Sequence, residues 1–154
     1  MAKKINELIF QLESLLNQIS TEKHEEEIWR GVLEKGEVED VHKITLVECH
    51  VINYIGNNRL TNSVGIAHNM QITKGGISKI TSRLLKKELI EAHRLEGNRK
   101  EVFYTLTPVG KKIFVLHEKL HAKVQARLEN MLQKYNKKEL NVISHFLKNL
   151  KEII

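Results

Sequence analysis

The chain has 154 residues and a single cysteine, which excludes an intrachain disulfide and is typical of a reducing compartment. No apolar run approaches the roughly 20 residues that span a bilayer, and the N-terminus lacks the apolar core of a signal peptide. We therefore expect a cytoplasmic protein without a membrane segment, folded as one domain with a substantial core.

Residues 3–30 are predicted to form one long amphipathic helix, because their apolar side chains recur at helical spacing. These side chains are Ile5, Leu8, Ile9, Leu12, Leu15, Leu16 and Ile19. An acidic loop is expected over residues 34–40, and a second helix over residues 45–55. The residues of the second helix that we expect to face inward are Leu46, Val47, Val51, Ile52 and Ile55.

Two helices joined by a short turn are predicted next, over residues 63–70 and 73–87. Thr73 is the expected N-cap of the second of them, since its hydroxyl can accept a bond from an amide of the first turn. The residues expected on its buried stripe are Ile77, Ile80, Leu84 and Leu85. Its other faces carry hydroxyls and cations. Such a pair resembles a helix-turn-helix, whose second helix enters the major groove of DNA.

A basic hairpin is predicted to follow, with strands over residues 89–94 and 102–106 and a turn over residues 96–100. Residues 71–100 hold eight cations against three acids, a net charge of +5, whereas residues 1–45 hold six cations against ten acids, a net charge of −4. A helix-turn-helix followed by a basic hairpin predicts a winged helix. Positive charge is concentrated on this predicted winged helix, as a polyanionic partner requires. The alternative is a surface helix followed by an incidental hairpin.

Thr107 and Pro108 are predicted to begin a long helix that reaches about residue 134, with Thr107 as N-cap and Pro108 at the first helical position. A last helix carries Leu140, Ile143, Phe146, Leu147, Leu150, Ile153 and Ile154. The terminal helices hold more apolar surface than one small lobe buries, so we expect a two-fold homodimer. The predicted fold class is mostly α, within α+β: a single domain over residues 1–154. It consists of dimerisation helices over residues 1–34 and 108–154 and a DNA-binding lobe over residues 45–107.

This order of elements resembles the MarR family of dimeric transcriptional regulators over nearly the whole chain. The most specific matches are the residues from Ile77 to Leu84 and the Leu-Thr-x-x-Gly pattern at residues 106–110. The family often has Asp-x-Arg in the wing, with the arginine in the minor groove. This chain has Asn98-Arg99-Lys100 instead, so Lys100 or Arg99 would take that role.

Double-stranded DNA is the expected partner, with the two recognition helices of a dimer about 34 Å apart on a near-palindromic operator. Phosphate contacts are expected from cations, and base contacts from side chains with short polar groups. The residues predicted to contact DNA are Gln71, Thr73, Lys74, Ser78, Lys79, Ser82, Arg83, Arg94, Arg99 and Lys100. The basic segments are interrupted by glycines and strands, so a membrane-bound amphipathic helix is not expected.

Two of the eight histidines, His117 and His121, lie one helical turn apart on the long helix and project from one face. Residues 117–121 also match H-E-x-x-H, the zinc-binding motif of metalloprotease helices, with Glu118 as the general base. Nothing else in the chain indicates a substrate cleft, so we do not expect an enzyme. A solvent-exposed helix face is the simplest alternative for the pair.

The chain also resembles the zinc-responsive uptake repressors of the MarR family, and that resemblance implies a four-ligand site. Glu27, near the end of the first helix, matches the family's glutamate; His50 matches the histidine of the second helix, and His117 and His121 match the pair on the long helix. Three imidazoles and one carboxylate suit a closed tetrahedral Zn²⁺ site. Zinc would then be the co-repressor at metal-uptake genes. The alternative is a MarR-type repressor that responds to a small organic ligand or an oxidant, with structural histidines.

A second metal site of those repressors uses a cysteine and two glutamates. The corresponding positions here are Leu33, Cys49 and Leu116, so that site is lost or rebuilt from other groups such as His24 or His42. We expect Cys49 to be a small buried apolar side chain.

Overall fold

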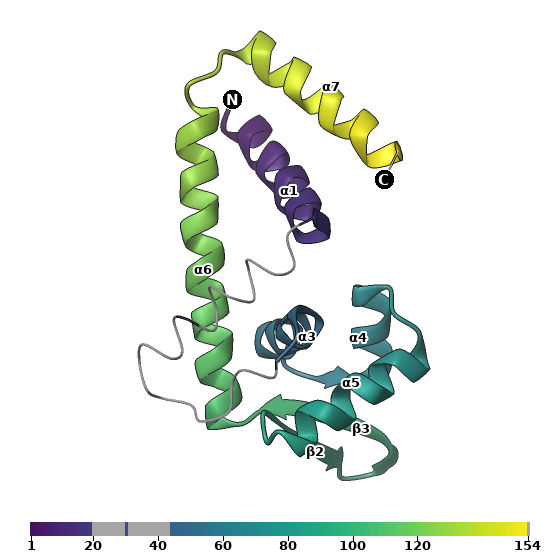
Figure 1. Ribbon diagram of the computed structural model, residues 1–154. Helices are drawn as coiled ribbons and strands as arrows, with labels where there is room; N and C mark the ends of the chain where they lie inside the picture. The colour runs from purple at the N-terminus through teal and green to yellow at the C-terminus, as the bar shows by residue number, and fades with distance from the viewer. Residues whose placement is uncertain (20–29, 31–43, 154) are drawn as a thin grey trace. The chain divides into compact units, whose positions relative to one another are not determined.

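The computed structural model describes residues 1–19, 30 and 44–153. The chain forms two compact units, one from residues 25–118, here called the winged unit, and one from residues 1–24 and 119–154, here called the helical unit. Helix α6 (Pro108–Leu132) contributes residues to both units (Figure 1). None of the described helices is both long and apolar enough to span a membrane.

The winged unit contains the predicted helix-turn-helix and hairpin. Its elements are α3 (Leu46–Asn57), β1 (Thr61–Asn62), α4 (Ser63–Met70), α5 (Lys74–Lys86), β2 (Ile90–Leu95), β3 (Asn98–Leu106) and the start of α6. Polar side chains cap the helices, because they accept bonds from amides that lack a helical partner. The cap by Thr73 was predicted, whereas the cap by Asn62 was not. Asn62 accepts from the Gly65 amide at 2.8 Å, and Thr73 accepts from the Gly76 amide at 3.1 Å.

The buried stripe of α5 differs from the prediction at two positions, Leu85 and Thr81. Ile77, Ile80 and Leu84 are buried as expected, but Leu85 is 36% exposed and Thr81 is only 2% exposed. At about 100° per residue, Leu85 turns away from the stripe that starts at Ile77, whereas Thr81 stays on it. The Thr81 hydroxyl is satisfied inside the helix, where it donates to the Ile77 carbonyl at 3.0 Å.

Helix α3 likewise buries most of its predicted inner face. Leu46, Val51, Ile52 and Ile55 are buried, but the prediction for Val47 is wrong, because this side chain is 39% exposed. The following residue, Glu48, is fully buried instead. Periodicity alone assigns a valine inward and a glutamate outward, so it misses a buried glutamate whose charge is balanced by cations of another segment.

The wing is a three-stranded antiparallel sheet in the order β1-β3-β2. The short strand β1 was not predicted; it pairs Thr61 with Tyr104 and Asn62 with Phe103. The predicted turn over residues 96–100 is too long, because Leu95 already pairs with Asn98 and β3 begins there. Gly97, with φ of 85°, permits this tight reversal. The wing residues Asn98, Arg99 and Lys100 are therefore part of a strand.

The junction between β3 and α6 explains the Leu-Thr-x-x-Gly pattern. The Thr107 hydroxyl accepts from the Gly110 amide at 3.0 Å and donates to the Glu88 carbonyl at 2.8 Å. The Thr107 amide donates to the Leu89 carbonyl at 3.2 Å. Pro108 occupies the first helical position, as predicted. The first turn of α6 is thus fastened to the segment between α5 and β2.

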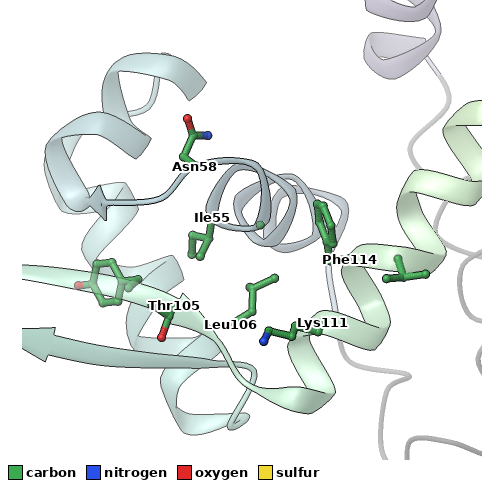
Figure 2. Close-up of a pocket in the computed structure, with 9 residues that line it drawn as sticks. Ile55, Asn58, Thr105, Leu106, Lys111 and Phe114 are labelled. Atoms are coloured by element: carbon green, nitrogen blue, oxygen red, sulfur yellow. The ribbon is translucent and has the colours of Figure 1, made fainter.

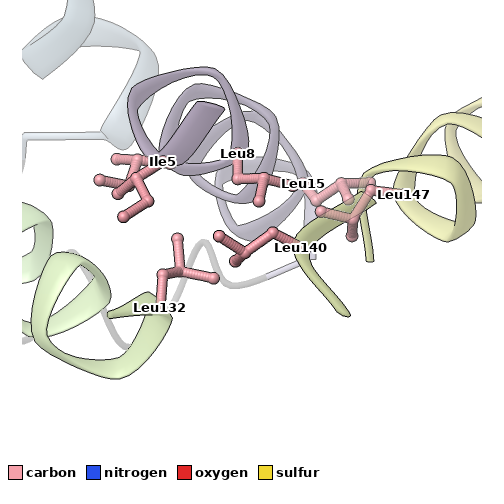
Figure 3. Close-up of a cluster of buried hydrophobic side chains, with 7 residues drawn as sticks. Ile5, Leu8, Leu15, Leu132, Leu140 and Leu147 are labelled. Carbon is pink, nitrogen blue, oxygen red and sulfur yellow. The ribbon is translucent and has the colours of Figure 1, made fainter. Parts of the chain in front are cut away.

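The helical unit packs α1 (Ala2–Ile19) and α7 (Lys137–Ile153) around the end of α6. The predicted helix over residues 3–30 is confirmed as far as Ile19; residues 20–29 lie outside the described part of the chain. The core side chains of this unit, drawn as sticks in Figure 3, are Ile5, Leu8, Ile9, Leu15, Leu132, Leu140 and Leu147. Several large apolar side chains of this unit stay outside that core: Phe10, Val142, Phe146 and Ile153 are 62–82% exposed.

Replacing Glu88 by glycine should stabilise the protein. Glu88 follows α5 with φ of 56°, in the left-handed region that costs a residue with a Cβ about 1–2 kcal/mol. After the extra unfolded-state entropy of glycine, about 0.5–1 kcal/mol, we expect a net gain of about 0.5–1 kcal/mol in the free energy of unfolding. Urea denaturation measures it. Glu91→Gly, in the extended strand β2, is the control and should destabilise; a loss of stability at both positions would contradict the argument.

Candidate functional site

The ten residues predicted to contact DNA all belong to the winged unit, and all ten are exposed. They come from two places: the turn and outer face of the helix-turn-helix, and the two strands of the hairpin. The inner face of α5 is occupied by Ile77, Ile80, Thr81 and Leu84. The serines and the cations of the helix are therefore left on the outside. The arrangement offers an exposed helix with short polar side chains, beside a basic hairpin.

The turn before α5 fixes where that helix begins. Gln71 is in the left-handed region with φ of 53° and caps the end of α4, where its amide donates to the Ala67 carbonyl. Thr73 then caps the start of α5. Only three residues thus separate α4 from α5, and Gln71, Thr73 and Lys74 are exposed around the N-terminus of α5. Amides at a helix N-terminus favour phosphate oxygens.

A buried carboxylate connects α3 to α5. Glu48 forms a capping box with Thr45: the Thr45 amide donates to Glu48 Oε2 at 3.0 Å, and the Glu48 amide donates to Thr45 Oγ1 at 3.2 Å. Arg83 Nε donates to Glu48 Oε1 at 3.0 Å, and Lys87 Nζ donates to Oε2 at 2.7 Å. The sequence analysis missed this cluster. The T-x-x-E pattern at residues 45–48 could have indicated the cap, though not the two cations.

In the wing, Arg94 lies where the pairing of β2 with β3 slips between His93 and Leu95. Its guanidinium donates across the hairpin to the Arg99 carbonyl. Neighbouring His93 Nε2 lies 2.7 Å from Thr105 Oγ1. The hairpin tip is therefore held by side chains as well as by its strands, and it presents Arg94, Arg99 and Lys100 to solvent.

Two of the four predicted metal ligands lie side by side within the winged unit. The rings of His50 on α3 and His117 on α6 have centroids 5.7 Å apart and cross at 78°. His117 is only 1% exposed, and His50 is half-buried. Two imidazoles that bind one tetrahedral zinc ion with Zn–N bonds of 2.0–2.1 Å bring their centroids to roughly 5 Å. The 5.7 Å between the centroids of His50 and His117 is close to that separation.

The other two predicted ligands do not complete a site among the described residues. His121 follows His117 by four residues on α6 and is half-buried. Glu27 lies outside the described residues. Within residues 1–19, 30 and 44–153, no three histidine, cysteine or acidic side chains form a group that could hold a metal ion. Of the three positions matched to a second metal site, Cys49 is 1% exposed, as predicted for a small core residue; Leu116 is half-buried, and Leu33 is not described.

Comparison with individual proteins of known family identifies relatives of the chain, although no family model matches it. The HTH-type transcriptional regulator PchR of Bacillus subtilis is 38% identical over 114 residues, which are 73% of this chain and 68% of PchR. The structure of ZitR of Lactococcus lactis, described as a zinc-responsive MarR family member, superposes with a TM-score of 0.64 over 90% of this chain and 97% of ZitR, at 23% identity.

The chain belongs to the MarR family of transcriptional regulators. FabT of Streptococcus pneumoniae, whose structure was solved in complex with DNA, is 25% identical to this chain. The two superpose over 99% of this chain and 96% of FabT, with a TM-score of 0.61. The relatives of this chain are transcriptional regulators and not enzymes. The H-E-x-x-H match at residues 117–121 therefore carries no protease function.

The winged unit of this MarR-family regulator also contains a cavity of about 320 Å³, at the meeting point of α3, β3 and α6 (Figure 2). Ile55 from α3, Leu106 from β3 and Phe114 from α6 give it an apolar lining. Among the residues that the structure describes, Lys111 is the one charged residue that lines it. The volume is at the lower end of the range for small-molecule sites.

Proposed function

We propose that the protein is a zinc-dependent repressor that binds double-stranded DNA as a homodimer. The observation that carries the DNA-binding part is the exposed polar and basic surface formed by α5 and the hairpin, in the order of elements that defines a winged helix. The outer face of α5 suits the major groove, and Arg99 or Lys100 of the wing suits the adjacent minor groove. The relative FabT has been crystallised in complex with DNA.

The homodimer is supported by apolar surface on the helical unit. Phe10 on α1 is 71% exposed, and Val142, Phe146 and Ile153 on α7 are 69%, 62% and 82% exposed. Large exposed apolar side chains of this kind mark protein–protein contacts when they gather on one unit. A two-fold dimer would place two copies of α5 on successive turns of a near-palindromic operator.

Zinc is the proposed effector because His50 and His117 already lie together and His121 follows one helical turn later. Glu27 is the fourth proposed ligand. When bound, the ion supplies a closed tetrahedral link among side chains of separate helices and no open position for catalysis. The family members ZitR, a 27% identical relative, and AdcR, a 24% identical one, add support, since ZitR is described as zinc-responsive.

The proposed switch acts through α3. This helix carries His50 in the metal site and, two residues earlier, Glu48 in its contact with α5. Fixing His50 therefore restrains the helix whose Glu48 binds Arg83 and Lys87 at the end of α5, so the DNA-competent arrangement of the dimer would be populated before DNA arrives. Couplings of about 1–3 kcal/mol correspond to DNA binding that is roughly 5- to 150-fold tighter with metal.

Zinc should tighten DNA binding by roughly 5- to 150-fold. His117→Ala should abolish this effect, while DNA binding without metal persists. Fluorescence anisotropy with a duplex selected from a random library, in zinc and in chelator, measures it, alongside the metal content of the purified protein. His145→Ala, at an exposed histidine of α7, is the matched control and should respond like the wild type. Equal affinity with and without zinc would refute the zinc part of the proposal.

The second candidate is a regulator controlled by a small organic ligand, with structural histidines. The cavity lined by Ile55, Leu106 and Phe114 favours it, because it offers an apolar site beside a wing strand. Lys111 at its lining would select a ligand with an anionic group. The same anisotropy measurement separates the candidates: zinc dependence that requires His117 supports the first, and zinc-independent binding leaves the second.

A further inference from the structure

Glu48 is the one carboxylate among the described residues that is buried, and the capping box alone does not explain it. A capping box needs a side-chain acceptor, which an uncharged glutamine also provides. A buried carboxylate is costly unless cations and hydrogen bonds compensate its charge. Its charge is therefore explained by Arg83 and Lys87, which lie one turn apart at the end of α5 and donate to its two oxygens.

Arg83 and Lys87 differ in the N–H donors that their bonds to Glu48 leave for another acceptor. Lys87, at the C-cap of α5, has a side chain that is 27% exposed and lies 2.7 Å from Glu48 Oε2. The Arg83 side chain is 53% exposed and is held only through Nε. Of the five N–H groups of a guanidinium, four are on the two terminal nitrogens. In the part of the chain that the structure describes, nothing accepts from them, so they are available to an anion.

We propose that Glu48 is a positioning residue for DNA binding: by holding Nε of Arg83, it aims the terminal nitrogens of the guanidinium at a DNA phosphate beside the groove that α5 enters. This inference rests on the proposed DNA-binding function. At about 100° per residue, Arg83 lies on the flank of α5, between the stripe of buried residues and the outer face. A cation at that position suits a phosphate better than a base edge. An arginine fixed in advance loses less side-chain entropy on binding and can engage a phosphate with two parallel bonds.

Glu48→Gln tests the inference by the sign of its effect. Glutamine matches the size of glutamate but has one acceptor, so it can keep the bond from Thr45 or the bond from Arg83, not both. Charge alone predicts tighter DNA binding, because the variant raises the formal charge of the chain from +6 to +7. Positioning predicts weaker binding, by about 3- to 10-fold, because Arg83 is released.

The double variant with Arg83→Gln separates the two effects. Once Arg83 is absent, Glu48→Gln has no guanidinium left to release, and freeing Lys87 from Glu48 only adds a cation for DNA. In that background the substitution should therefore leave DNA affinity unchanged or raise it. Anisotropy titrations of the wild type, the two single variants and the double variant, with a duplex selected by the wild type, complete a double-mutant cycle. The Nε–H signal of Arg83 in ¹H–¹⁵N spectra should be protected from exchange in the wild type and lose that protection in Glu48→Gln.

The same weakening in both backgrounds would overturn the positioning role and leave Glu48 as a purely structural residue. If Glu48→Gln fails to fold by circular dichroism, Arg83→Lys serves instead. It keeps the charge but has no Nε, and positioning predicts a loss close to that of Arg83→Gln. Full affinity in Arg83→Lys would contradict it. A wild-type protein that binds no duplex at low salt would refute the proposed function itself, which is a different result from either of these.

Discussion

DNA affinity should fall by about 10³- to 10⁵-fold between 50 and 200 mM salt, the largest effect that we expect. Six exposed cations of each protomer lie among the proposed contacts: Lys74, Lys79, Arg83, Arg94, Arg99 and Lys100. If a dimer makes 6–10 phosphate contacts with them, binding releases a matching number of counterions, and the loss of affinity follows from the salt dependence of that release. Anisotropy titrations at several salt concentrations measure the slope of log K against log salt.

Single substitutions show which residues contribute to the slope of log K against log salt. Lys79→Gln on the outer face of α5 should make the slope shallower by about one contact per protomer. Lys134→Gln, at an exposed lysine between α6 and α7 that is not a proposed contact, should leave the slope unchanged. Salt-insensitive binding, or equal effects of the two variants, would contradict an interface formed by α5 and the wing.

The helices and their starting residues could be predicted from the sequence because the signals are local. Thr73 and Thr107 cap helices through bonds to amides three residues later, which residue type and spacing indicate. The errors lie at the margins of apolar stripes. Val47 and Leu85 are apolar residues near a buried face, and burial at such edges is decided by neighbours distant in sequence.

The contacts that build the site could be predicted less well. Glu48 pairs with residues 35 and 39 positions away, and neither periodicity nor local spacing carries that information. The nearness of His50 to His117 depends on how α3 packs against α6. A family resemblance proposed that pair, whereas the spacing of histidines in the sequence indicated only His117 and His121. Residue type thus indicates which chemistry is available, and packing decides which groups meet.

Gly110→Ala should be the most damaging small substitution for folding. A Cβ at Gly110 would lie 2.0 Å from the Leu89 carbonyl oxygen, a backbone atom that cannot move without disturbing the start of β2. That carbonyl also accepts from the Thr107 amide, so a shift would weaken the fastening of α6 to the wing. We expect a loss of about 3–5 kcal/mol in the free energy of unfolding, a large part of the 5–15 kcal/mol typical of a domain.

Gly75→Ala is the matched control, because both glycines lie in the first turn of a helix but a Cβ at Gly75 would meet nothing within 4 Å. Alanine there should raise stability by about 0.5–1 kcal/mol, since glycine is the poorer helix former. Urea denaturation of both variants gives the two free energies. Effects of opposite sign would show that contact with Leu89, and not helix propensity, fixes glycine at residue 110. A Gly110→Ala protein as stable as the wild type would mean that α6 and β2 can separate at this junction without cost, and the wing would then lack the rigid base that DNA binding requires of it.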